Sequence, residues 1–212
     1  DQWTPDEKQI QTLQESDLII ANGPGAPFAQ WMVRVSLPES RICHTTDNLD
    51  LPDFISVKDY RVIHRHGPEG EHSHPFMVAQ TWLDPLTAKK QAQQIAVALE
   101  TGYPEMGSVF RDNLRGLEQD LDGLAARMEV IPDGQVITST PRLKFLTRAA
   151  GLEDTHLLWF DLPQEPSWSA TEEQDFVARA KQSSSKSILF DTAPPDWLKN
   201  RLNALGYQTY YL

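Results

Sequence analysis

The sequence predicts an α/β fold with a mainly parallel β-sheet that helices cover on both faces. Short apolar runs typical of buried strands, such as 187–190, recur along the chain, and helical segments of about 10 residues separate them. The 212 residues are enough for one large domain or for two lobes of about 100 residues each.

The first 60 residues contain both helical and strand signals. Ile10 and Leu13 lie at helical spacing and predict a helix over 5–15, with Thr4 as its N-cap. The other elements expected here are strands at 17–21 and 41–44, a short helix at 28–35 and a loop-rich stretch at 49–60.

Two longer helices follow. Asp84 as N-cap and Pro85 at the first helical position start a helix that Gly102 ends. Pro104 opens a second helix of roughly 24 residues, about 36 Å long. Its spacing leaves two interpretations open, an amphipathic helix packed on one core or a strut that joins two lobes. Its apolar positions are Met106, Phe110, Leu114, Leu117, Leu121, Leu124 and Met128.

The second half repeats strand and helix. Ligands of parallel sheets bind outside the carboxyl ends of the strands, and Asp191 follows a predicted strand at that end. A site carboxylate and a cap of the following loop are equally good accounts of Asp191. The predicted strands are 135–138, 156–160, 187–190 and 208–211, and the predicted helices are 141–150, 171–182 and 195–205.

Composition excludes several classes of protein. The chain has 19 basic and 30 acidic residues and a net charge of −11, which argues against a binder of nucleic acid or of anionic membranes. No apolar stretch is long enough to span a bilayer. Cys43 is the one cysteine, so no disulfide can form within the chain. The sequence leaves the oligomeric state open.

The segment with candidate chemistry is His64-Arg-His66-Gly-Pro-Glu-Gly-Glu-His72-Ser-His74. It contains four of the six histidines, with Glu69 and Glu71 between them. Neutral imidazoles with nearby carboxylates are the ligand set of zinc and similar ions, and the glycines and proline let the backbone fold around an ion. The alternative is a solvated polar loop. The pattern favours a metal site.

Enzymatic chemistry has little support. The sequence contains no nucleophile elbow, no phosphate-binding loop and no dinucleotide fingerprint. Cys43 and His44 are neighbours on a strand and point to opposite faces, which favours a buried thiol beside a surface histidine. A metal-dependent hydrolase would need a general base such as Glu69 or Glu71, but no substrate pocket is marked. The chain is therefore expected not to be an enzyme.

Several phrases together resemble the metal-binding solute receptors of ABC importers, the TroA/ZnuA-like family. The resemblance covers nearly the whole chain. The phrases are Ser16-Asp-Leu-Ile-Ile-Ala-Asn-Gly23, the histidine segment, Thr81-Trp-Leu-Asp-Pro85, Val136-Ile-Thr-Ser-Thr140 and Ile188-Leu-Phe-Asp191.

The resemblance implies two α/β lobes with mainly parallel sheets, joined by one long helix. The lobes would be 1–103 and 131–212, and the helix 104–130. It also implies Zn²⁺, or less favourably Mn²⁺, as the bound ion and a membrane permease of the ABC type as the partner. The location would be periplasmic or cell-surface, with a signal peptide or lipid anchor removed. The chain is expected to be incomplete at its ends.

The ligand set of the family is not reproduced. Gln80 and Thr140 stand where relatives usually have ligand histidines, and the first usual ligand would precede Asp1. The final carboxylate is either Asp191 or a residue beyond Leu212. Two functions therefore remain open: a metal receptor, or an interaction protein that keeps the fold without high-affinity transport. For the receptor, the candidate metal ligands are His64, His66, His72, His74 and Asp191.

Overall fold

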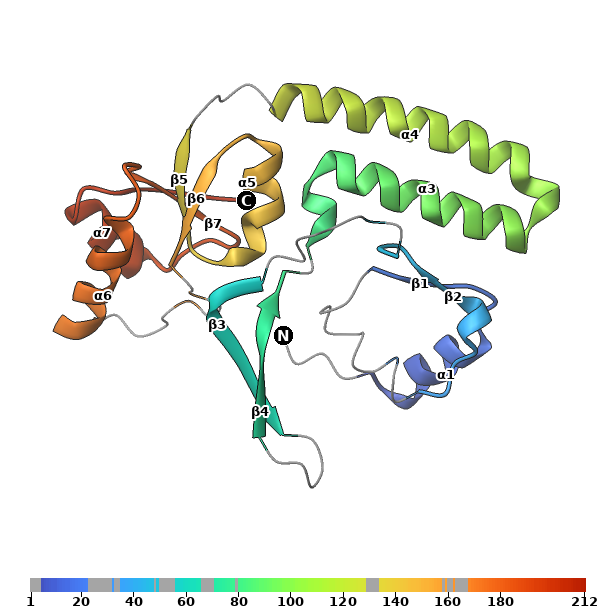
Figure 1. The fold of residues 1–212 in the computed structure, drawn as a ribbon, viewed down its shortest axis with the longest axis horizontal. Coiled ribbons are helices and arrows are strands. Elements are labelled where there is room, and N and C mark those ends of the chain that lie inside the picture. The colour runs from blue at the N-terminus through green and yellow to red at the C-terminus, as the bar shows by residue number, and fades with distance from the viewer. Residues whose placement is uncertain are drawn as a thin grey trace. The chain divides into compact units, whose positions relative to one another are not determined.

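The structure, a computed structural model, consists of two compact units (Figure 1). Unit 1 comprises Asp1–Ser56 and Phe76–Ala126, and unit 2 comprises Val57–Pro75 and Arg127–Leu212. The structure describes residues 5–22, 32, 35–47, 49, 78, 80–128, 134–157, 159, 162 and 168–212 with their side chains, and residues 56–65 and 71–77 by their backbone.

Unit 1 contains the two short strands that the sequence predicts near residues 17–21 and 41–44. β1 (Ile19–Ala21) and β2 (Ile42–His44) pair in parallel. Cys43 is buried, and burial raises the pKa of its thiol. The next side chain, His44, instead contacts Glu39 at 3.0 Å near the surface. The two side chains therefore form no nucleophile–base pair, as the alternation along a strand predicts.

The first helix begins two residues later than the sequence predicts. α1 (Glu7–Glu15) has Asp6 as its N-cap, so the prediction of Thr4 was wrong. The Asp6 carboxylate accepts the Gln9 backbone N–H at 2.8 Å, and the Gln9 side chain accepts the Asp6 N–H at 2.9 Å. This reciprocal pair satisfies two amide groups that a helix start leaves free.

α3 (Pro85–Gly102) begins as predicted. The Asp84 carboxylate accepts the backbone N–H groups of Leu86 at 3.0 Å and Thr87 at 3.4 Å. The most buried positions of the helix include Thr87 and Gln91 as well as Ala96. The buried face of α3 is therefore partly polar, because Gln91 belongs to a buried hydrogen-bond network. The 3₁₀ turns of unit 1 are η1 (Glu39–Arg41), η3 (Thr81–Leu83) and η4 (Pro104–Met106).

α4 (Gly107–Met128) is the predicted long helix and runs antiparallel to α3 (Figure 1). Three polar side-chain pairs bridge the two helices. From one pair to the next, the residue number rises in α3 and falls in α4, as an antiparallel arrangement requires. Much of the predicted apolar stripe stays exposed, including Leu117 and Leu124. The bridges are Lys89–Asp122, Gln93–Glu118 and Glu100–Arg111. α4 therefore does not bury its stripe in one core, and it continues along the chain from unit 1 to the start of the second segment of unit 2.

The histidine segment belongs to a two-stranded sheet. β3 (Ser56–Arg65) pairs with β4 (Glu71–Met77), and the short connection requires an antiparallel pair. The prediction that 49–60 is loop-rich was wrong for its last five residues. Polar and charged residues interrupt the apolar alternation that identifies strands, so these strands have a weak sequence signal.

Unit 2 contains a four-stranded parallel sheet of order β6-β5-β7-β8. The sequence predicts β5, β7 and β8 within a residue, but it places β6 three residues too late. Glu153 and Asp154 make the observed β6 more polar than the apolar run that follows it. The strands are β5 (Gln135–Thr138), β6 (Glu153–His156), β7 (Ser187–Phe190) and β8 (Gln208–Tyr211).

The core of unit 2 joins the sheet to two helices. Ile188 and Phe190 of β7 pack with buried side chains of α6 (Ala170–Ala180) and α7 (Asp196–Ala204), including Phe176. The turn η5 (Pro141–Leu143) and helix α5 (Lys144–Ala149) follow β5. The α/β fold class with parallel sheets, flanking helices and one long joining helix is thus confirmed. No helix in the described part of the chain has the length and apolarity that a membrane crossing needs.

Candidate functional site

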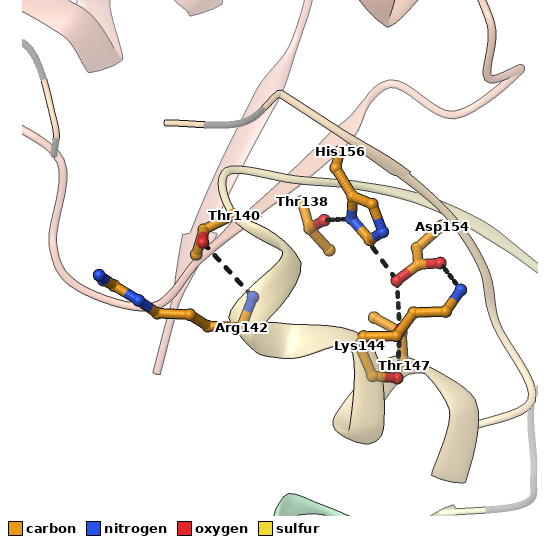
Figure 2. Close-up of polar contacts among 7 residues, drawn as sticks. All are labelled: Thr138, Thr140, Arg142, Lys144, Thr147, Asp154 and His156. Carbon is orange, nitrogen blue, oxygen red and sulfur yellow. Dashed lines mark hydrogen bonds and ion pairs between the residues drawn. The ribbon is translucent and has the colours of Figure 1, made fainter. Parts of the chain in front are cut away.

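The carboxyl edge of the unit 2 sheet collects polar side chains from neighbouring strands (Figure 2). Thr138 ends β5 and His156 ends β6, and these two residues are register partners. Asp191 follows β7, the neighbour of β5 on its other side. Because parallel sheets bind ligands at this edge, it is the candidate functional site of unit 2.

Asp191 forms an ion pair. Its Oδ2 lies 3.3 Å from Nη1 of Arg142, and the two side chains are 20% and 30% exposed. The sequence predicts the position of Asp191 at the strand end but does not reveal this partner. The strand order explains the pair. Because β5 and β7 are neighbours and Arg142 follows β5 by four residues, Arg142 can reach the carboxylate that follows β7.

Thr140 has a structural role in its own turn. The residue is fully buried, and its hydroxyl accepts the backbone N–H of Arg142 at 3.4 Å (Figure 2). The side chain therefore caps the start of η5. It supplies no imidazole at a position where the resemblance leads one to expect a ligand histidine.

The buried carboxylate of Asp154 in β6 binds side chains of α5. The Asp154 side chain has no exposed surface, and it accepts hydrogen bonds from Lys144 Nζ and from Thr147 Oγ1, the latter at 2.7 Å (Figure 2). His156 Nδ1 lies 3.8 Å from Asp154 Oδ2. A buried carboxylate needs such partners, so Asp154 ties the start of α5 to β6.

His156 is held in its neutral form. Its Nδ1 lies 2.7 Å from Thr138 Oγ1. Burial lowers the pKa of His156; the Asp154 carboxylate opposes this shift, and Lys144 and Arg179 add to it. These contacts give His156 a structural role at the ends of β5 and β6.

Unit 1 has a second polar cluster, at the carboxyl ends of β1 and β2. Gln91 of α3 donates to Asn22 Oδ1 at 2.5 Å and to Thr45 Oγ1 at 2.8 Å, and it accepts from Thr81 Oγ1 at 3.1 Å. Gln91 thereby links both strand ends to η3. Gln80 directly precedes η3, and its buried Oε1 has no hydrogen-bond partner within the described part of the chain.

Three of the four predicted histidines lie on the paired strands β3 and β4. His64 belongs to β3, and His72 and His74 belong to β4. His66 lies outside the described residues. Where side chains are described, no group of three His, Cys, Asp or Glu residues could hold a metal ion.

Comparison with protein families identifies the relatives of this fold. A family model described as "Zinc-uptake complex component A periplasmic" matches residues 1–210. The chain belongs to this family. Membership confirms the resemblance inferred from the sequence, and the family consists of extracytoplasmic receptors for zinc uptake by ABC transport, which are not enzymes.

Solved structures show that the fold is shared. The metal-dependent lipoprotein YcdH from Bacillus subtilis has 18% identity and a TM-score of 0.71, over 99% of this chain and 73% of that chain. The Zn(II)-bound ZnuA-like domain of Streptococcus pneumoniae AdcA has 17% identity and a TM-score of 0.72, over the same shares of the two chains. No curated protein sequence matches the chain.

Proposed function

We propose that this member of the zinc-uptake family captures Zn²⁺ on its histidine-bearing hairpin and delivers it to an ABC-type membrane permease. The observation that carries the proposal is the placement of the histidines on two paired strands and their connection. His64, His66, His72 and His74 are the proposed source of the ligands, with Asp191 as an additional carboxylate.

The hairpin suits a metal site because it brings distant histidines together. Positions 72 and 74 are two residues apart on β4, and such positions share a face of a strand. The short connection folds β3 back onto β4, so His64 returns to the same end of the hairpin. A zinc site uses about four ligands, so the five proposed residues exceed what one ion needs.

The donor types favour zinc over manganese. Imidazole nitrogen suits Zn²⁺, whereas Mn²⁺ prefers carboxylate, carbonyl and water oxygens. The proposed set has four imidazoles and one carboxylate. Because histidine binds metal in its neutral form, capture releases protons and weakens as the pH falls below about 6.5. The ion is the cargo of the receptor.

The carboxyl edge of the unit 2 sheet gives some support to the alternative function, an interaction protein without high-affinity metal transport. Thr140 is engaged in capping η5, and Asp191 is paired with Arg142. An interaction protein that keeps the receptor fold without high-affinity transport would show these features. Such a protein would bind zinc weakly and at several surface positions.

Metal titration separates the two functions. Chelator-stripped protein is titrated with Zn²⁺ and Mn²⁺ in competition with a calibrated dye. We expect one zinc ion bound per chain at nanomolar or tighter affinity, and a loss of more than tenfold in the His72→Ala/His74→Ala variant. The matched control is His44→Ala, which removes an imidazole outside both the hairpin and the carboxyl edge of unit 2 and leaves the affinity unchanged. Micromolar binding of several ions to the parent chain would favour the alternative.

A further inference from the structure

The carboxyl edge of the unit 2 sheet contains a permanent positive charge, the guanidinium of Arg142. Thr138 of β5 is the register partner of Leu189 of β7, and the backbone N–H of Ser139 donates to the Leu189 carbonyl oxygen at 2.9 Å. The ladder therefore continues one residue beyond the end of β5. Consequently the segment with Arg142 runs beside the segment with Asp191, at the edge where parallel sheets bind ligands.

The local structure holds Arg142 in this position. Its backbone N–H donates to the buried Thr140 hydroxyl, and Pro141 fixes the first position of η5. Two residues that follow closely, Leu143 of η5 and Phe145 of α5, are fully buried. The backbone of Arg142 is therefore anchored, while its side chain remains 30% exposed.

A guanidinium stays protonated at any pH at which the protein is folded. The Asp191 carboxylate thus has a permanent cationic partner 3.3 Å away. A divalent ion that binds Asp191 must share the carboxylate with this positive charge or replace it. Sharing places two cations a few ångströms apart at a partly buried site, where screening by water is incomplete.

We propose that Arg142 is an internal competitor of the metal ion, which pairs with Asp191 in the metal-free receptor and is displaced when the ion binds. This inference rests on the proposed function, because it requires Asp191 to contribute to metal capture. The competition lowers the apparent affinity for every cation. An ion that binds Asp191 must therefore gain enough from the histidines to displace the guanidinium.

The test is the Zn²⁺ affinity of Arg142→Gln, measured by dye competition at pH 6.5 and pH 8. We expect at least a threefold gain, and the same factor at both pH values because arginine does not titrate between them. The matched control is Arg201→Gln, which removes an arginine paired with Glu173 elsewhere in unit 2. A gain no larger in Arg142→Gln than in Arg201→Gln overturns the inference.

A double-mutant cycle with Asp191→Asn separates this inference from the proposed function. If Arg142 acts through Asp191, Asp191→Asn weakens zinc binding and Arg142→Gln brings no further gain in that background. If Asp191→Asn leaves the affinity unchanged while His72→Ala/His74→Ala lowers it, the receptor function stands and the competition is refuted. If the parent chain binds no zinc with high affinity, both proposals are refuted.

Discussion

His156 illustrates how the surroundings of one residue set its protonation. The imidazole contacts Thr138 at 2.7 Å and lies beside the buried Asp154 carboxylate, which Lys144 and Thr147 already engage. Since burial lowers the pKa of His156, the folded protein binds a proton less readily than the unfolded chain does. Acidification must therefore shift the equilibrium toward unfolding.

The contribution of His156 to the unfolding free energy is expected to be constant above about pH 7 and to decrease as the pH falls through the ordinary histidine pKa of about 6.5. His156→Gln removes this component, while its amide oxygen can still accept from the Thr138 hydroxyl. Urea unfolding of both proteins between pH 5 and pH 8 measures the difference. An equally steep decrease in the variant would assign the pH dependence to other groups.

At the scale of the element, α3 depends on its N-cap. Asp84 is buried and satisfies two backbone N–H groups of the first turn. Asp84→Ala is expected to destabilise the protein by about 1 kcal/mol, the typical value for loss of an N-cap. Asp84→Asn keeps an oxygen acceptor and is expected to retain most of the stability. Chemical denaturation checks both values, and equal losses in the two variants would show that the charge of Asp84 matters more than its capping.

The sequence predicts elements well where local signals and burial agree. α3 and β7 follow local rules, since a capping residue starts the helix and an apolar run forms the strand. β6 does not, because partners from α5 make its polar side chains compatible with burial. These partners lie ten and seven residues before Asp154 in another element, and the periodicity of a strand cannot detect them.

The sequence predicts part of the candidate site, namely the position of one carboxylate but not its partner. The position of Asp191 after β7 follows from the general geometry of parallel sheets. Its pairing with Arg142 depends on β5 and β7 being neighbours, and a single sequence does not fix strand order. The cap formed by Thr140 likewise becomes visible only when the start of η5 is known.

At the scale of the whole molecule, the proposed ligands have a common location in the chain. His64, His66, His72 and His74 fall within Val57–Pro75, and Asp191 falls within Arg127–Leu212. Both segments belong to unit 2. A ligand that binds only the folded form of one unit stabilises that unit against opening, and the other unit benefits only as far as the two unfold together.

Zinc is therefore expected to slow amide hydrogen exchange in β5 and β7 far more than in α3. At free zinc 100-fold above its dissociation constant, the stabilisation of unit 2 is about 2.7 kcal/mol, which corresponds to about a hundredfold slower exchange through openings that release the ion. Exchange measured by mass spectrometry with and without zinc resolves the two units. In Asp191→Asn the difference shrinks, because a contact between the ion and the β7 end is lost. Equal protection of α3 and β7 would contradict a site confined to unit 2.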